Sequence, residues 1–169
     1  MSFKKMTVRM MMVFALGLFC MVGATQAKAA TDYEEGEYTN KDLKIMSCII
    51  FCEAGDQCAA GKIAVGIVIM NRVFSDEFPN TVKKVVYERG QFSPVRQGKM
   101  RRELKKYAAG AYDKGSRKKC KEAAIKALEG RDYVNYKGKK IDMSKYLYFS
   151  MHLRNAKLRI SGHDFKEKW

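Results

Sequence analysis

Apolar residues recur at helical spacing through the first half of the chain. After Asn40, which suits an N-cap, Leu43, Met46 and Ile49 fall on one face and predict a helix over 41–53. Between 59 and 74 apolar residues cover more than one face, which predicts a second helix that is nearly buried. Helical patterns also follow at 82–86 and 101–109, and a clearer one at 118–129.

The second half of the chain alternates turns with short β-type runs. Pro94 disfavours a helix before it, so we predict an extended segment over 91–95. We further predict a strand and turn over 133–141, a buried aromatic strand over 146–149 and an extended segment over 159–165. The chain has 169 residues and no internal repeat, which favours one folded domain.

The first 29 residues have the layout of a secretory signal peptide. Lys4, Lys5 and Arg9 precede an uncharged stretch over 10–24, and Ala27-Lys28-Ala29 suits a cleavage site. The apolar stretch is short for a membrane anchor, and Phe19 before Cys20 disfavours a lipoprotein. We expect a signal peptide over 1–29, a flexible lead-in over 30–40, one folded domain over 41–169 and no membrane span after cleavage.

The charge balance favours an acidic polymer as partner. The chain has 33 basic and 18 acidic residues, a formal charge of +15, and the leader carries only four of the basic ones. Cell-wall glycans with peptide carboxylates and phosphate-rich wall polymers both suit this charge. Nucleic acid would also suit the charge, but export of the protein argues against it as a partner. Because the lysines are spread along the chain, ordinary surface charge remains an alternative.

Four cysteines follow the leader: Cys48, Cys52, Cys58 and Cys120. An even number in an exported chain permits two disulfides, and we expect Cys48 and Cys52 to pair with Cys58 and Cys120 rather than with each other. Their spacing is unusual for zinc, so we expect no metal.

Glu53 is the strongest catalytic candidate. It ends an apolar helix, and apolar surroundings raise the pKa of a carboxyl, so that it can donate a proton at neutral pH. The alternative is a helix-terminal glutamate in water. Glycoside cleavage usually needs a second carboxylate, for which Asp56 and Glu88 are candidates. Without one, the C6 hydroxyl of the sugar can attack the anomeric carbon.

Other polar residues suit substrate binding. Gln91, Phe92 and Ser93 lie between a glycine and a proline, an arrangement that suits sugar recognition but also an ordinary turn. Asn71 and His163 could bind substrate or hydrogen-bond backbone groups. His152 and His163 also leave open a Cys–His hydrolase, provided that a cysteine is reduced.

Several segments together resemble the cell wall hydrolases of the spore cortex-lytic family. The resemblance spans about 42–165 and is carried, in order, by Cys52-Glu53-Ala54-Gly55, the run from Gly61 to Val73, Phe78-Pro79-Asn80-Thr81, Gly90-Gln91-Phe92-Ser93-Pro94-Val95 and Ile160-Ser161-Gly162-His163-Asp164-Phe165.

The resemblance implies an α+β, mainly helical, lysozyme-like single domain with a small β region. It implies a lytic transglycosylase that cleaves peptidoglycan between N-acetylmuramic acid and N-acetylglucosamine. The family's essential glutamate falls on Glu53, and its glycine-aromatic and glycine-histidine segments fall on Gly90 to Phe92 and Gly162-His163.

The leading interpretation is therefore an exported, monomeric peptidoglycan-cleaving enzyme without a cofactor, acting in wall remodelling or spore cortex lysis. Glu53 is its acid and base, and Gln91, Phe92, Ser93, Asn71 and His163 are its substrate-binding candidates. The alternative from another class is a non-catalytic cationic wall-binding module of the same fold.

Overall fold

The computed structural model describes residues 38–167. The predicted signal peptide and most of the lead-in lie outside these residues. Six α-helices and five short strands follow in order within the described part. They are α1 (Asn40–Ala54), α2 (Ala59–Val73), α3 (Val82–Tyr87), α4 (Ser93–Arg96), α5 (Lys99–Ala108), α6 (Gly115–Leu128), β1 (Tyr133–Tyr136), β2 (Lys139–Asp142), β3 (Tyr148–Ser150), β4 (Leu158–Ile160) and β5 (His163–Lys166), with a 3₁₀ turn η1 (Ala111–Asp113) before α6.

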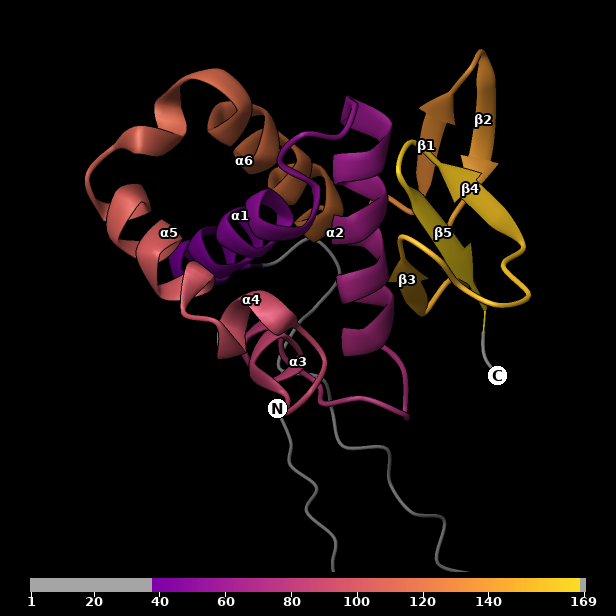
Figure 1. The fold of residues 1–169 in the computed structure, drawn as a ribbon, viewed down its shortest axis with the longest axis horizontal. Helices are drawn as coiled ribbons and strands as arrows, with labels where there is room; N and C mark the ends of the chain where they lie inside the picture. Colours follow the sequence, from indigo (N-terminus) through magenta and orange to yellow (C-terminus); the bar gives the residue numbers. More distant parts are fainter. Residues whose placement is uncertain (1–37, 168–169) are drawn as a thin grey trace, which may run out of the picture.

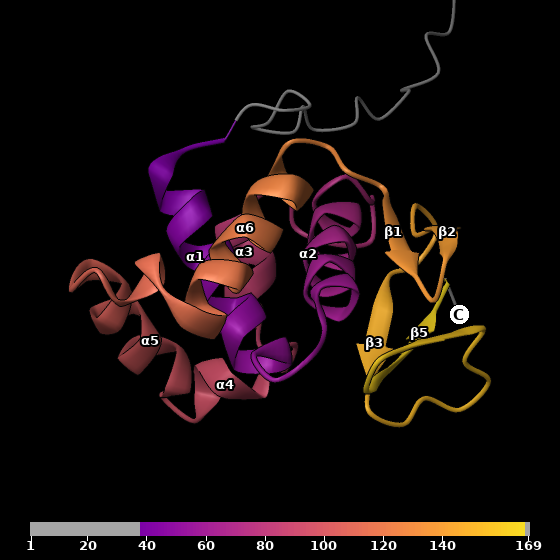
Figure 2. The ribbon, with the colours of Figure 1, turned by 90° about the horizontal axis from the view of Figure 1, so that it is seen from above.

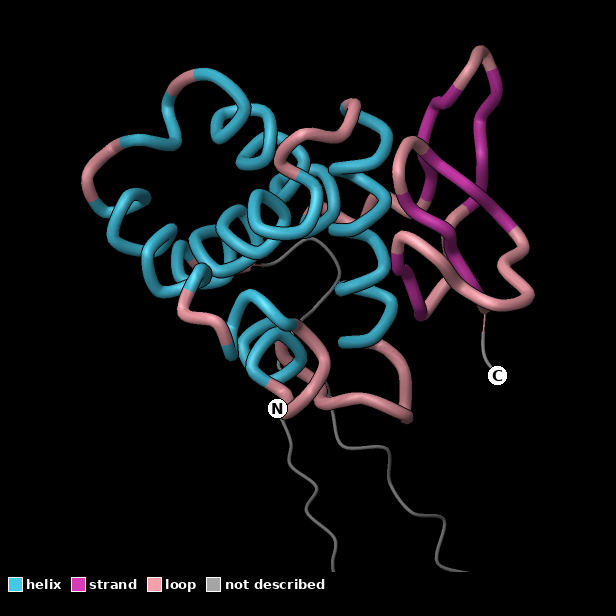
Figure 3. Tube along the Cα trace, in the orientation of Figure 1, coloured by secondary structure: helices cyan, strands magenta, loops and turns pink. Residues whose placement is uncertain are grey.

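Helix α2 separates the other helices from the strands (Figures 1 and 2). It packs against α1, α3 and α6 on one side and against β1, β3 and β4 on the other. Because both sides of α2 are covered, its sequence carries apolar residues on more than one face. Figure 3 shows the division between the helical part and the strands.

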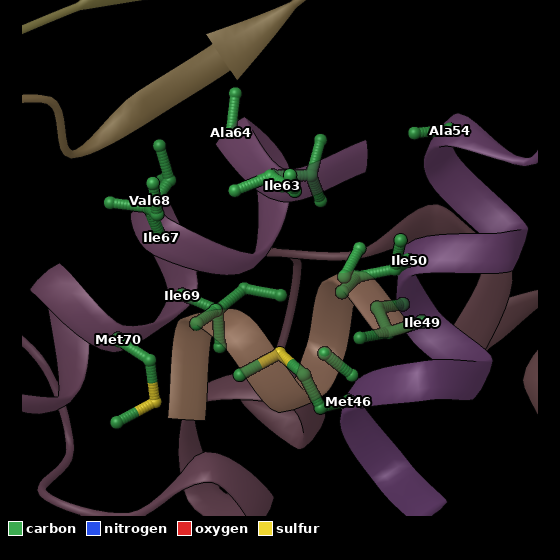
Figure 4. Close-up of a cluster of buried hydrophobic side chains, with 14 of the residues drawn as sticks. Met46, Ile49, Ile50, Ala54, Ile63, Ala64, Ile67, Val68, Ile69 and Met70 are labelled. Atoms are coloured by element: carbon green, nitrogen blue, oxygen red, sulfur yellow. The ribbon is translucent and has the colours of Figure 1, made fainter. Parts of the chain in front are cut away.

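The core lies where α1, α2 and α6 meet. Met46, Ile49 and Ile50 of α1 face the apolar side chains of α2, and all three are fully buried (Figure 4). A Cβ at Gly66 would lie 2.9 Å from Cβ of Ala127 and 3.2 Å from Cδ1 of Ile50. Glycine therefore allows the three helices to approach closely at this point.

The first helix begins one residue earlier than predicted. Thr39, not Asn40, is the N-cap, and its side chain and that of Asp42 form a reciprocal capping box. Asp42 is buried beside the helix start, where its charge also suits the helix dipole.

Two predictions in the second half of the chain are wrong in detail. The segment after Phe92 is the short helix α4 rather than extended, because Pro94 sits in the first turn, where a helix needs no N–H from it. The segment over 159–165 is not one extended run: β4 and β5 form a hairpin whose turn places Ser161 at φ +54°.

The strands form two small antiparallel sheets. β1 and β2 form a hairpin with Tyr133 opposite Asp142, as the predicted strand and turn require. The second sheet has the order β3-β5-β4, with Phe149 opposite Phe165. The predicted aromatic strand is present as β3 but begins at Tyr148 and is only half-buried. No helix among residues 38–167 is long and apolar enough to cross a membrane.

Candidate active site

A cleft of about 350 Å³ opens between the end of α1 and the strands β3 and β5. It brings together residues that are more than one hundred positions apart in the sequence. The described residues that line it are Glu53, Arg72, Gly90, Gln91, Phe92, Ser93, Phe149, Ser150, Met151 and His163.

Glu53 lies in the last turn of α1, half-buried between Cys52 and Ala54, which are both buried. Burial raises the pKa of Glu53 above the ordinary glutamate value, although the positive charges of Lys99 and Arg72 act in the opposite direction. Lys99 also donates from Nζ to the backbone oxygen of Cys52 at 2.9 Å, which fixes this turn of the helix. The site thus favours a protonated carboxyl facing the cleft.

Glu53 is the only acidic residue among the described residues that line the cleft. Asp56 is exposed and lies outside the lining. Glu88 is half-buried and also lies outside it. Neither candidate for a second carboxylate is therefore placed in the cleft beside Glu53.

The loop that follows Glu53 is anchored to two distant elements. The Gln57 Oε1 accepts a hydrogen bond from the Gly162 N–H at 2.6 Å, which ties the loop to the β4–β5 turn. The Ser116 hydroxyl at the start of α6 donates to the backbone oxygen of Gly55. Lys62 donates to the backbone oxygen of Gln57. These contacts fix the position of α1 relative to the strand that carries His163.

Arg72 is a site residue that sequence reasoning missed. It is 4% exposed, donates from Nε to the Leu147 oxygen at 2.8 Å and from Nη1 to Gln91 Oε1 at 3.3 Å. Three aromatic rings surround its guanidinium at 4.9 to 5.8 Å from their centroids: Phe78, Phe92 and Tyr148. Burial lowers the pKa of Arg72. In sequence it is an ordinary basic residue in the last turn of a helix, so no local signal marks it.

The glycine-aromatic segment, Gly90 to Ser93, also lines the cleft. Gln91 and Ser93 are exposed and line the cleft with polar groups. Phe92 is buried, with its ring 6.3 Å from that of Phe149. Phe92 therefore forms part of the cleft floor rather than a free stacking surface.

His163 lines the same cleft from β5. Its ring lies edge-on to Phe149 at 5.4 Å, and its Nδ1 is buried without a hydrogen-bond partner among residues 38–167. Burial lowers the pKa of His163, with a smaller opposing effect from Asp56. The imidazole therefore favours its neutral form.

Asn71 is not brought into the cleft. Its Nδ2 donates to the backbone oxygens of Met143 at 2.8 Å and Tyr146 at 2.9 Å. Both amide hydrogens are thus used to hold the segment between β2 and β3, which indicates a structural role in place of the expected contact with substrate.

The predicted disulfides are not formed: Cys48, Cys52, Cys58 and Cys120 are all free thiols. Cys48 and Cys52 are buried on α1, and Cys120 is buried as well. Cys58, just before α2, is the exposed one of the four. Burial raises the pKa of Cys48 and Cys120 to about 11 and of Cys52 to about 12. These thiols resist ionisation, and no described cysteine lines the cleft, which disfavours the Cys–His alternative.

Comparisons with known proteins identify the family. The sequence model described as "Cell Wall Hydrolase" matches residues 56–160, beginning just after Glu53. The spore cortex-lytic enzyme of Oceanobacillus iheyensis is 30% identical over 95 residues, 56% of this chain and 30% of that protein. The spore cortex-lytic enzyme of Bacillus cereus is 36% identical over 63 residues, 37% of this chain and 24% of that protein. The chain thus spans less than a third of the length of these curated relatives.

Two solved structures share the fold. The catalytic domain of the germination-specific lytic transglycosylase SleB from Bacillus anthracis is similar with a TM-score of 0.54 and 25% identity, covering 76% of this chain and 95% of that one. The catalytic domain of the Bacillus cereus SleB protein gives a TM-score of 0.56 and 24% identity, covering 76% and 91%. The expected α+β, mainly helical, lysozyme-like fold is confirmed. The chain belongs to the cell wall hydrolase family.

Proposed function

We propose that this protein is an exported lytic transglycosylase. It cleaves the glycan strand of peptidoglycan between N-acetylmuramic acid and N-acetylglucosamine, with Glu53 as both general acid and general base. Family membership and the lytic transglycosylase named among the solved structures support the reaction class. The observation that carries the proposal is that Glu53, with its raised pKa, is the only acidic residue among the described residues that line the cleft.

In the first step Glu53 acts as an acid. Its carboxyl donates a proton to the glycosidic oxygen as the bond from that oxygen to the anomeric carbon breaks. Burial raises the pKa of Glu53 and so favours the protonated carboxyl that a general acid requires.

In the second step the Glu53 carboxylate acts as a base. It accepts the proton of the C6 hydroxyl of the muramic acid residue while that oxygen bonds to the anomeric carbon. A 1,6-anhydro ring forms, Glu53 regains its proton, and no water is consumed. Because the C6 hydroxyl is the nucleophile, the reaction needs no second carboxylate, and none of the other described residues that line the cleft is acidic.

The other cleft residues bind the sugar. Gln91 and Ser93 offer an amide and a hydroxyl to ring substituents, and Arg72 holds Gln91 in place through its Nη1. His163 contributes its imidazole ring to the cleft wall, where the ring can contact the sugar. The positive charge of the chain attracts it to the acidic wall in vegetative remodelling or cortex lysis.

The test is mass spectrometry of fragments released from purified vegetative and cortex peptidoglycan. The wild-type protein is expected to release anhydro-ended muropeptides, and Glu53→Gln is expected to lower the rate by about 10²–10⁴-fold. Asp56→Asn and Glu88→Gln test whether either acid outside the cleft serves as a second carboxylate, and Glu129→Gln, at an exposed position, is the matched control. Loss of reducing ends in Asp56→Asn or Glu88→Gln would establish a hydrolase with two carboxylates. No release by the wild type would favour the cationic wall-binding module.

A further inference from the structure

A second and larger cavity lies on the other side of the loop that follows Glu53. Its volume is about 590 Å³, and we call it the α6 groove because α6 forms one wall and the start of α2 the other. The described residues that line it are Gly55, Asp56, Gln57, Cys58, Ala59, Lys62, Ile63, Gly115, Ser116, Lys119, Glu122, Ala123 and Lys126. None of them lines the cleft of Glu53.

Lys62 is the unusual residue of this groove. It is only 3% exposed, yet it belongs to none of the ion pairs found within residues 38–167. Its ammonium donates to the backbone oxygen of Gln57, a neutral acceptor that uses one of three hydrogens. A buried ammonium without a carboxylate is costly, and an anion in the groove would compensate for it.

The exposed rim of the groove carries both signs of charge. Lys119 and Lys126 lie seven positions apart on α6 and both line the groove, with Glu122 between them. Asp56 contributes a second carboxylate from the opposite wall. The lining thus suits a ligand that bears several carboxylates and also an amine, rather than a uniformly anionic polymer.

The groove and the cleft share a wall. Residues 55–57 line the groove and follow Glu53 after one intervening residue, Ala54. Gln57 is hydrogen-bonded to Gly162, which is next to His163 of the cleft. A ligand that branches from the glycan strand can therefore reach from one cavity to the other across this loop. In peptidoglycan the branch is the stem peptide, which carries carboxylates and amines.

We propose that the α6 groove binds the acidic stem peptide of peptidoglycan, with Lys62, Lys119 and Lys126 receiving its carboxylates. This inference rests on the proposed function, since it assigns a second part of the same substrate to a second cavity. Phosphate-rich wall polymers are the alternative occupant, and the carboxylates of Asp56 and Glu122 act against them.

Direct binding of a soluble stem tetrapeptide, measured by calorimetry, tests the groove without any cleavage. Lys119→Gln/Lys126→Gln is expected to weaken binding by about tenfold. The matched control is Lys105→Gln/Lys118→Gln, which removes two exposed charges outside the groove and should change affinity by less than about twofold. No binding, or equal losses in both variants, would overturn the proposal. Binding of a glycerol-phosphate oligomer in preference to the peptide would overturn it as well.

Cys58 locates the ligand, because it is exposed and lines the groove. Bound tetrapeptide should slow its alkylation by iodoacetamide, read by mass mapping of the Cys58 peptide. Binding that leaves this rate unchanged would place the peptide elsewhere and contradict the proposal.

Kinetics separate this inference from the proposed function. Wild-type protein should show a lower KM for peptide-bearing glycan strands than for strands stripped of peptides, and the two values should converge in Lys119→Gln/Lys126→Gln. Equal KM values in the wild type would reject the groove while leaving glycan cleavage intact. Peptide binding without cleavage of either strand would reject the proposed function alone.

Discussion

Gln57 and Gly162 join the loop after Glu53 to the β4–β5 turn through one hydrogen bond, 2.6 Å from the Gly162 nitrogen to Gln57 Oε1. A Cβ at position 162 would lie 2.7 Å from Gln57 Nε2 and 2.9 Å from Oε1. Glycine is therefore needed for this approach. The bond holds the loop after Glu53 against the turn before His163, which are far apart in the sequence.

Removing this hydrogen bond should affect peptidoglycan cleavage more strongly than the free energy of unfolding. Gln57→Ala leaves a partly buried N–H without its partner, and we expect a loss of about 1–2 kcal/mol in the free energy of unfolding by urea. Cleavage of peptidoglycan should fall more than about tenfold, because a small displacement of Glu53 lowers catalytic efficiency. The matched control is Gln97→Ala, at an exposed position at the end of α4. Full activity of Gln57→Ala would contradict the anchoring role.

Replacement of Arg72 by lysine should be harmful although charge is kept. Lysine cannot make the bonds to Leu147 and Gln91 together, nor fill the space between the three aromatic rings. We expect Arg72→Lys to lose about 2–4 kcal/mol of stability and most of its activity. Arg89→Lys, at an exposed position, should match the wild type in both measurements. An active and stable Arg72→Lys would show that only the charge matters.

The pH dependence of cleavage should report Glu53. Its pKa is raised in the folded protein, so the acid is protonated below that pKa and activity is lost as pH rises through it. The fall in kcat/KM should therefore lie above the ordinary titration range of glutamate. A fall within the ordinary range would mean that the acid is not the buried carboxyl described here.

The same shift affects stability. Ionised Glu53 is less favourable in the fold than in water, so its stabilising contribution is present at low pH and is lost as pH rises through the folded pKa. Glu53→Gln should therefore become more stable relative to the wild type between acidic and neutral pH, as measured by urea unfolding. Glu129→Gln, at an exposed position, should show no such trend.

The contribution of Glu103 to stability should have the opposite pH dependence. Although burial opposes ionisation, hydrogen bonds from Arg117 and Lys106 lower its pKa to about 2, and Tyr112 also donates to it. Its contribution is present above the unfolded pKa and is lost as pH falls from about 4.5 towards 2. At neutral pH Glu103→Gln should cost about 3 kcal/mol in urea unfolding. Glu122→Gln, which is exposed, should leave stability nearly unchanged, and equal losses would contradict this network.

The free cysteines give a prediction about reactivity. Without reduction, iodoacetamide should label Cys58 in the folded protein, whereas Cys48, Cys52 and Cys120 should react only after unfolding, because all three are buried. Mass mapping of each peptide would check this. Cysteines that resist labelling after unfolding, until a reductant is added, would show that disulfides form.

Local sequence signals predicted much of the helical part. The periodicity of α1 and α2 and the apolar setting of Glu53 follow from residues close together in the chain, since a helix places positions three and four apart on one face. The same holds for the turn of the β1–β2 hairpin. Pro94 shows the limit of such signals, because a proline fits equally well before or within the first turn of a helix.

Which polar residues share the cleft could not be predicted from local sequence, because it depends on contacts between distant elements. Asn71 and Arg72 are neighbours in α2, yet Asn71 holds the segment before β3 while Arg72 lines the cleft, because successive helix positions point about 100° apart. Likewise, the α6 groove depends on Ser116 and Gln57 bringing α6 and the β4–β5 turn to the loop after Glu53. The apolar periodicity of α1 is enough to single out Glu53 as the candidate acid, because it depends on residues close together in the chain. Which residues surround Glu53 depends on long-range packing, because they come from α2, the 90–93 segment, β3 and β5.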